Sequence, residues 1–309
     1  MTTLLISHPA TLDHQTSAGH PERPDRIRAV DKALAGEAFG ALDRRLADKA
    51  TFDQVALAHP RAYVDAIEDV SPETGTVHID SDTVMSPGTL EAILRGAGAG
   101  AQAVDAVLGG EVRNAFAAMR PPGHHAERTR AMGFCLFNNA AIAARHAQAK
   151  HGIGRVAIVD WDVHHGNGSQ DIFWADPSVL CCSTHQMPLY PGTGALSERG
   201  DHDTIVNAPL RPGANGDAFR DAFTSRILPR LEQFGPELVI ISAGFDAHWR
   251  DPLANLQLEA ADFAWATKML MDVADKHAGG RVVSILEGGY DLQGLAESVS
   301  AHVTTLMDA

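Results

Sequence analysis

The stretch RVAIVDWDVHHGNG, residues 155–168, joins a short apolar run to a dense group of acidic and imidazole side chains. Residues 156–159 are all apolar and rich in β-branched side chains, which is typical of a strand buried on both faces of a parallel sheet. Asp160, Asp162 and His164 follow, and alternation along an extended backbone sends these three to the same side. Open α/β sheets bind ligands at the carboxyl ends of their strands. A cation site here is therefore a better interpretation than a turn with solvated polar residues.

The composition is that of an ordinary globular protein. The chain has 309 residues, of which 45% are hydrophobic and 21% are charged. This length allows one large α/β domain or two smaller ones, and because we find no linker, repeat or low-complexity tract, we expect a single domain over residues 1–309. The net charge of −14, without a long Lys/Arg cluster, argues against nucleic-acid binding and is compatible with cationic substrates.

The cysteines and the N-terminal residues predict a cytoplasmic protein. Cys135, Cys181 and Cys182 are odd in number and lie in apolar contexts, which favours reduced core thiols over a disulfide framework. The first residues, MTTLLISHPATLD, lack the basic and apolar regions of a signal peptide. No run approaches the roughly 18 apolar residues that cross a bilayer. We therefore expect no membrane association, and nothing indicates an oligomeric state.

Short apolar runs alternate with segments of helical period along the chain, which predicts a parallel sheet with helices on both faces. The glycines at 96, 98 and 100 lie within a predicted helix, so we interpret them as sites of close helix packing and not as a phosphate loop. Ser86 and Pro87 are expected to cap and open that helix. We expect strands at 4–7, 112–119, 156–159, 179–183, 238–242 and 282–286, and helices at 87–108 and 138–150.

Polar side chains follow four of the predicted strands. His124 and His125 come after the strand at 112–119, Asp246 follows 238–242, and Tyr290 follows 282–286. Because the carboxyl ends of parallel strands meet at one edge, we expect all of these groups in a single cleft.

The metal-binding part of this cleft is predicted to consist of Asp162, His164 and Asp246. A catalytic zinc ion has three protein ligands and one open position, and it polarises a carbonyl group and lowers the pKa of bound water. The alternative for Asp246, taken alone, is a helix N-cap.

The two adjacent histidines are candidates for proton transfer. One of His124 and His125 would act as general base, and Asp160 and Asn167 are the nearest candidates to orient their rings. Tyr290 could donate a hydrogen bond to a developing oxyanion, although alone it would be interpreted as a packing aromatic. Together these groups predict a metal-assisted amide hydrolase.

Several stretches of the chain carry a resemblance to a known enzyme family. They are HPERPDR (20–26), RPPGHHA (120–126), GFCLFNNAAIAA (133–144), VAIVDWDVHHGNGSQDIF (156–173), YPGTG (190–194), SAGFDAH (242–248) and LEGGYDL (286–292). These motifs resemble those of the zinc-dependent histone deacetylase superfamily, and they extend over almost the whole chain. Asn167 is closer to the class II branch than to class I, which usually has Asp there.

This resemblance implies the three-layer arginase/deacetylase α/β fold, with an eight-stranded, mainly parallel sheet. It implies that Tyr290 polarises the acyl carbonyl and that Arg26 guides acetate out through an internal channel. It also implies zinc at Asp162, His164 and Asp246; catalysis by His124 and His125; an acyl-lysine tunnel at Gly133, Phe134, Tyr190 and Gly288; and structural potassium at Asp160, Asp162, His164 and Ser183.

The resemblance leaves the substrate open between acyl-lysine proteins or peptides and small N-acetyl amines. The polyamine-selective branch has a glutamate directly after an Asp-Pro pair, where this chain has Leu253, and this does not support polyamine selectivity by that mechanism. Two further alternatives are less favoured. A two-manganese ureohydrolase would need more carboxylates at the central motif. A silent acyl-lysine-binding scaffold would lack a ligand, the base or the tyrosine, and all of these are present.

Overall fold

The computed structural model describes residues 2–308 and has a central sheet of eight strands. The strands are β1 (Thr3–Ser7), β2 (Asp43–Leu46), β5 (Asn114–Ala117), β6 (Val156–Asp160), β7 (Val179–Gln186), β8 (Ile205–Leu210), β9 (Leu238–Ala243) and β10 (Val282–Leu286). Their order is β2-β1-β5-β10-β9-β6-β7-β8, and every neighbouring pair is parallel. A separate antiparallel pair is formed by β3 (Val77–His78) and β4 (Val84–Met85).

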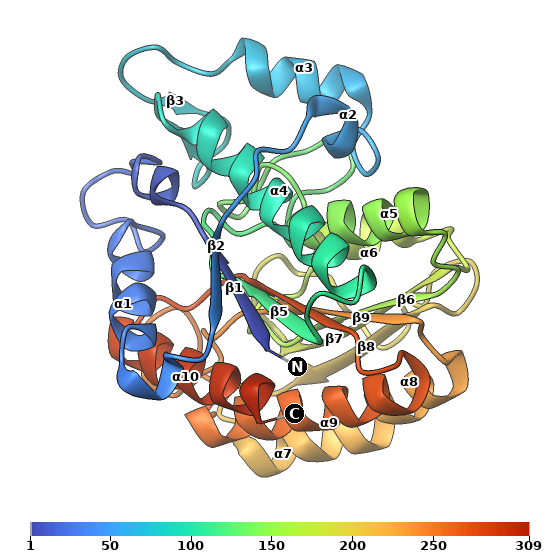
Figure 1. Ribbon diagram of the computed structural model, residues 1–309. Coiled ribbons are helices and arrows are strands. Elements are labelled where there is room, and N and C mark those ends of the chain that lie inside the picture. Colours follow the sequence, from blue (N-terminus) through green and yellow to red (C-terminus); the bar gives the residue numbers. More distant parts are fainter. Residues whose placement is uncertain (1, 309) are drawn as a thin grey trace.

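Helices cover both faces of the sheet (Figure 1). One layer contains α2 (Phe52–Val55), α3 (Arg61–Asp69), α4 (Thr89–Leu108), α5 (Asn139–His151) and α6 (Asn167–Phe173). The other contains α1 (Asp25–Leu34), α7 (Gly216–Ala222), α8 (Leu228–Phe234), α9 (Ala260–His277) and α10 (Leu292–Met307). The predicted sheet with helices on both faces is confirmed.

The central strand β6 shows why its sequence is apolar throughout. Val156 and Ile158 belong to the hydrophobic cluster under α4 and α5, whereas Ala157 and Val159 belong to the cluster under α9 and α10. All four side chains are buried. Successive residues of a strand point to opposite faces, so a strand between two helix layers has no position for a polar side chain.

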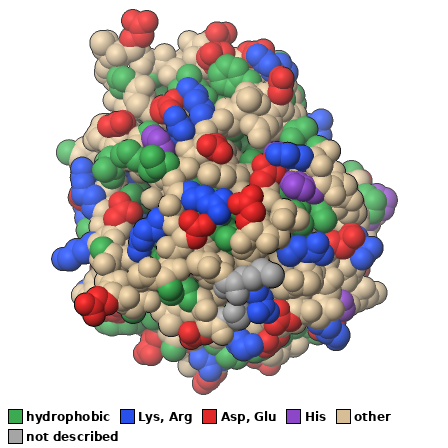
Figure 2. Space-filling view, in the orientation of Figure 1, with side chains coloured by type: hydrophobic (Ala, Val, Ile, Leu, Met, Phe, Trp, Pro, Cys, Tyr) green, Lys and Arg blue, Asp and Glu red, His purple; other side chains and the backbone are tan. Residues whose placement is uncertain are grey.

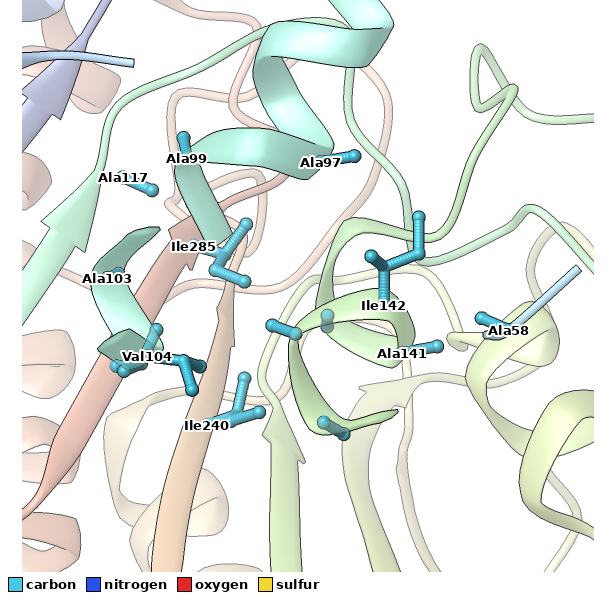
Figure 3. Packing of buried hydrophobic residues seen from close by; sticks show 14 of the residues in the cluster. Ala58, Ala97, Ala99, Ala103, Val104, Ala117, Ala141, Ile142, Ile240 and Ile285 are labelled. Atoms are coloured by element: carbon cyan, nitrogen blue, oxygen red, sulfur yellow. The ribbon is translucent and has the colours of Figure 1, made fainter. Parts of the chain in front are cut away.

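The glycines of α4 allow close packing, as predicted. A Cβ atom at Gly98 would overlap the backbone carbonyl of Asp48, and one at Gly100 would lie 3.3 Å from the Cβ of Ala143 in α5. Figure 3 shows the small side chains of this helix beside strand residues of the same cluster. The helix itself begins at Thr89, so the prediction that Ser86 and Pro87 cap and open it was wrong.

Two of the strands that were not predicted lie at the edges of the sheet. β2 has the sequence DRRL and alternates between exposed and half-buried positions, so it carries little apolar signal. β8 contains Pro209, which cannot donate a backbone hydrogen bond but is tolerated because this strand pairs on one side only. The strand predicted at 112–119 is shorter than expected, and the one predicted at 179–183 is longer.

The three cysteines are buried and unpaired, as predicted for core thiols. No helix within residues 2–308 is both long and apolar enough to cross a bilayer. On the face seen in Figure 2, acidic and basic side chains are interspersed.

Candidate metal and catalytic centre

The polar groups predicted to share a cleft come from four adjacent strands. In the order β5-β10-β9-β6, the segment after β5 carries His124 and His125, and the segment after β10 carries Tyr290. The segment after β9 carries Asp246, and the one after β6 carries the motif that begins at Asp160. Their side chains meet at the carboxyl edge of the sheet.

Asp162, His164 and Asp246 form a compact, buried group. One ligand atom from each lies within 4.8 Å of the others. The Nδ1 atom of His164 is 3.2 Å from Oδ1 of Asp162 and 3.0 Å from Oδ2 of Asp246. The backbone N–H groups of Gly288 and Val163 donate to these two carboxylates at 2.9 and 2.8 Å and fix their orientation.

The electrostatics of this group favour a bound cation. Burial, followed by the charge of Asp162, raises the pKa of Asp246 to about 7. Burial alone would lower the pKa of His164, but the two carboxylates outweigh it and raise the pKa to about 10. Two buried carboxylates and a buried imidazole form a nitrogen and oxygen donor set that suits Zn²⁺ with an open fourth position.

Gly288, which the resemblance assigns to the tunnel, lies directly beside the candidate metal ligands. It is not among the residues that line the cavity described below. A Cβ atom at this position would overlap the carboxylates of both Asp246 and Asp162. Glycine at 288 therefore allows the backbone to approach the candidate metal ligands.

The two histidines lie side by side, with their ring centroids 4.0 Å apart. Nδ1 of His124 is 2.9 Å from Oδ2 of Asp160, and Nδ1 of His125 is 2.8 Å from Oδ1 of Asn167. Each histidine thus contacts the orienting partner that the sequence suggested for the pair.

Asn167 determines the tautomer of His125. Its amide nitrogen donates to Oε1 of Glu127 at 2.7 Å, so its oxygen must face the histidine. Nδ1 of His125 then carries the proton, and Nε2 carries the lone pair. Burial, followed by the charges of neighbouring His124 and His164, lowers the pKa of His125 well below its usual value.

The pKa of His124 is displaced in the direction opposite to that of His125. Burial lowers its pKa, but the carboxylates of Asp162 and Asp160 outweigh burial and hold the pKa well above its usual value. Two adjacent imidazoles with pKa values displaced in opposite directions are typical of paired acid and base groups.

A cavity of about 190 Å³ leads to this centre. Tyr190 lines this cavity and is 39% exposed, with its ring centroid 5.2 Å from that of His125. Gly133 has φ +57°, and a Cβ atom there would overlap the His125 ring. The residues that line the cavity are Asp82, His125, Gly133, Phe134, His164, Leu189, Tyr190, Leu253 and Tyr290.

Arg26, which was predicted to lie along a product channel, is fully buried behind Tyr290. Its Nε and Nη2 atoms donate to the carbonyls of Gly289 and Glu287 at 2.6 and 2.5 Å. Burial raises the pKa of Tyr290 well above its usual value, although Arg26 opposes this. The phenol of Tyr290 is therefore a neutral hydrogen-bond donor.

Sequence reasoning missed three residues near the centre. Asp82 and Leu189 line the cavity. Asp82 lies in a loop that follows no predicted strand, whereas Leu189 follows the strand predicted at 179–183 but has an aliphatic side chain, which gives no signal of a site. Asp251 accepts hydrogen bonds from the backbone N–H groups of Tyr290 at 2.7 Å and Leu253 at 3.0 Å. Its place in the Asp251-Pro252 pair was visible, but its acceptor role was not.

Two of the four residues predicted to hold potassium, Asp160 and Ser183, line a common void. Asp160 pairs in register with Ser183, and both line a small void of about 10 Å³. Asp162 and His164 are not among the residues that line it. The hydroxyl of Ser183 is 2.9 Å from Nδ1 of His185.

A second group of possible metal ligands lies between α4 and α5. Oδ1 of Asp105 is 2.9 Å from Nε2 of His146 and 2.7 Å from Nε2 of His151. The other carboxylate oxygen is 2.7 Å from the ammonium group of Lys150. Its negative charge is therefore already balanced by this side chain.

Comparison with known proteins identifies the family. A sequence model of the histone deacetylase domain matches residues 20–306. The chain belongs to the histone deacetylase family. The predicted membership is thus confirmed, and relatives named as deacetylases or as an amidohydrolase support a hydrolase.

Relatives and a solved structure support the same assignment. The histone deacetylase-like amidohydrolase of Pseudomonas aeruginosa is 41% identical over 89% of this chain and 73% of its own. Human polyamine deacetylase HDAC10 is 41% identical over 93% of this chain and 44% of its own. The crystal structure of the HDA15 HD domain matches with a TM-score of 0.94 and 39% identity, covering 99% of this chain and 88% of the other. The predicted arginase/deacetylase fold is confirmed.

Proposed function

We propose that this protein is a zinc-dependent amidohydrolase that removes an acetyl or related acyl group from the side-chain amine of lysine, releasing acetate. The observation that carries this proposal is the meeting of the Asp162, His164 and Asp246 group with His125 and Tyr290 at the base of one cavity. Histone deacetylase family membership supports hydrolysis of an acylated amine.

Asp162, His164 and Asp246 would hold the zinc ion. When bound, zinc supplies Lewis acidity toward the acyl carbonyl and lowers the pKa of water. Nε2 of His125 carries the lone pair and this residue lines the cavity, so it is the candidate general base, which then returns the proton to the leaving amine. Tyr290 would donate its phenolic hydrogen to the oxygen on which negative charge develops.

His124 would remain protonated beside Asp160 and add positive charge near the same oxygen. Because it already donates from Nδ1 and carries a raised pKa, it is less suited than His125 to accept a proton. The division of roles between the two histidines follows from their different partners, a carboxylate and an amide.

The walls of the cavity suit a methylene stem. Phe134 and Tyr190 offer aromatic surfaces, and Leu189 and Leu253 add aliphatic ones. Leu253 is uncharged, which favours acyl-lysine over a polyamine cation at that position. Asp82, however, places a carboxylate in the cavity wall.

The second candidate function is deacetylation of a small N-acetyl amine such as an acetylpolyamine. Asp82 and the net charge of −14 favour a cationic substrate, and one relative is a polyamine deacetylase. A two-manganese ureohydrolase is disfavoured because the group contains only two carboxylates and one imidazole. A silent acyl-lysine-binding scaffold is disfavoured because the ligands, the base and Tyr290 all occur together.

The test measures turnover of an acetyl-lysine peptide and of N-acetylputrescine by zinc-loaded wild type, by chelated protein and by Tyr290→Phe. We expect peptide turnover that is lost on chelation and falls about 10²- to 10³-fold in the variant. Tyr63→Phe is the matched control, because this tyrosine donates to the carbonyl of Leu136 and does not line the cavity.

The outcomes separate the candidates. Fast turnover of N-acetylputrescine with little peptide turnover would favour the second function. Binding of acetyl-lysine peptide without turnover, unaffected by Tyr290→Phe, would favour the scaffold, and two manganese ions per chain would favour the ureohydrolase.

We further propose a structural potassium ion near Asp160 and Ser183, which is tested by measuring whether the thermal stability of the protein depends on potassium.

A further inference from the structure

Glu287 is a fully buried acid beside the catalytic centre for which the mechanism above has no role. It follows β10 directly and does not line the cavity. Its Oε2 atom accepts hydrogen bonds from the backbone N–H groups of Gly123 at 2.6 Å and His124 at 3.1 Å. Its Oε1 atom accepts from the hydroxyl of Ser242 at 3.2 Å.

The segment before His124 explains why such an acceptor is needed. β5 ends at Ala117, and Pro121 and Pro122 have no N–H group, so the next two N–H groups, those of Gly123 and His124, lie beyond the strand and have no strand partner. A Cβ atom at Gly123 would overlap backbone atoms of Asn139 and Phe137, which shows that the turn is tightly enclosed. Buried N–H groups must have an acceptor, and one carboxylate oxygen serves both.

The carboxylate of Glu287 is held by neutral donors and not by an ion pair. Within residues 2–308, no lysine or arginine lies within salt-bridge distance of it, and Arg26 instead bonds to its backbone carbonyl. Burial raises the pKa of Glu287 to about 7, while the charge of His124 and the N–H of Gly123 oppose this rise. The position of the Glu287 carboxylate therefore depends on where these neutral donors lie.

Glu287 connects the two segments that carry the proposed catalytic groups. β5 and β10 are neighbours in the sheet, and the carboxylate joins the segment after β5 to the segment after β10. On one side the hydrogen bond fixes the backbone of His124, whose ring then meets Asp160 at 2.9 Å. On the other side Glu287 is three residues from Tyr290.

We propose that Glu287 is a positioning residue: through the backbone N–H groups of Gly123 and His124 it sets the place of the paired histidines. This inference rests on the proposed function of that pair. We infer further that the geometry of these hydrogen bonds, and not the negative charge of the carboxylate, places the paired histidines. Glutamine should therefore be able to take over the role of Glu287. Its amide oxygen can accept from both N–H groups, and its NH₂ group can donate to the hydroxyl oxygen of Ser242.

The experiment compares Glu287→Gln and Glu287→Ala in the zinc-loaded full chain. We expect kcat of Glu287→Ala to fall about 10²-fold, as for a displacement of about 1 Å, with KM within about twofold. We expect kcat of Glu287→Gln to stay within about threefold of wild type. Asn114→Ala is the matched control, because it removes a buried side-chain bond to the carbonyl of Leu306 at the opposite end of β5.

A spectroscopic measurement tests the same inference without turnover. The Nδ1 proton of His124, which is bonded to Asp160, should give a low-field proton resonance. We expect this resonance to shift or disappear in Glu287→Ala and to stay in place in Glu287→Gln and Asn114→Ala.

The outcomes are decisive in both directions. An unchanged kcat and an unchanged His124 resonance in Glu287→Ala would overturn the inference. A loss of kcat in Glu287→Gln as large as in Glu287→Ala would also overturn it, because the charge would then be the important property. If the wild type turns over neither substrate, the proposed function fails, and the His124 resonance alone decides whether Glu287 positions the ring.

Discussion

The guanidinium carbon of Arg26 lies 4.9 Å from the centroid of the Tyr290 ring. The same guanidinium donates to two carbonyl groups of the segment that precedes this tyrosine, those of Glu287 and Gly289. A single side chain from α1 therefore fixes both the backbone and the ring of the proposed hydrogen-bond donor. Its planar fork is suited to this task because the donors have fixed relative directions.

Arg26→Lys should impair both catalysis and stability. A lysine ammonium has no planar fork and cannot reproduce both contacts and the stacking on Tyr290. We expect kcat to fall about 10- to 100-fold and the free energy of unfolding to fall by about 2–4 kcal/mol, from the loss of charge-assisted hydrogen bonds. Steady-state kinetics and urea unfolding measure the two effects.

The matched control is Arg28→Lys on the same helix. Arg28 is exposed and pairs with Asp25 at 2.8 Å, so its replacement should change the unfolding free energy by less than about 1 kcal/mol. Equal effects of the two substitutions would contradict a special role for Arg26.

Asn167→Asp should move the acid limb of the pH profile of kcat/KM to higher pH. The proposed base is neutral His125, so activity is lost as the pH falls through its pKa, which burial and the charges of neighbouring histidines lower in the wild type. A carboxylate at 167 would stabilise the protonated ring and raise that pKa by about 1–3 units. The profile is measured between about pH 5 and 8, the range in which an unperturbed histidine changes its charge.

Asn215→Asp is the control for this substitution. Asn215 is the N-cap of α7, where its side chain accepts from the N–H of Ala218, and aspartate is equally suited to that role. An acid limb that stays in place in Asn167→Asp would argue against His125 as the base.

Removal of the proposed zinc ion should lower the thermal stability of the protein. A ligand that binds only the folded state stabilises it by about 2.7 kcal/mol at 100 times its dissociation constant. We expect chelation to lower the melting temperature and added zinc to restore it. Asp246→Asn should abolish this zinc-dependent stabilisation, since it removes one of the three clustered ligands.

Asp105→Asn distinguishes the two groups of possible ligands. Asp105 belongs to the group between α4 and α5. Zinc content and turnover that are kept in Asp105→Asn and lost in Asp246→Asn would support the assignment. The reverse pattern would place the ion between the helices.

His302 should make the protein less stable in acid. It is buried between Thr267 and Ser284, and burial lowers its pKa to about 3. The unfolded chain takes up this proton near pH 6.5, so the contribution is complete above that pH and is lost as the pH falls toward 3. Between pH 6 and 4, the slope of the unfolding free energy against pH should be smaller in His302→Gln by about 1.4 kcal/mol per pH unit, which corresponds to about one proton.

Urea unfolding at several pH values measures this slope. His202→Gln is the control, because His202 is exposed and its substitution should leave the slope unchanged. A slope that does not change in His302→Gln would show that another group accounts for the acid sensitivity.

The sequence predicted best where a physical rule links local pattern to position. Asp162, Asp246 and Tyr290 follow apolar strands, and parallel pairing brings such positions to one edge whatever lies between them. Asp82 escaped this rule because its place depends on how a loop folds over the edge. Glu287 escaped it in another way, since its role is to accept from N–H groups 164 and 163 residues earlier.

β10 is the last strand in the chain, yet it lies in the middle of the sheet between β5 and β9. Until residues 282–286 leave the ribosome, β5 and β9 have no strand to pair with between them, so any sheet formed by the earlier strands has an unpaired inner edge. Unpaired edges are prone to pair with other chains, so the nascent protein depends on rapid insertion of this strand. The same insertion delivers Tyr290 to the paired histidines and the candidate metal ligands, so a chain shortened before β10 would lack part of the proposed catalytic centre as well as its central strand.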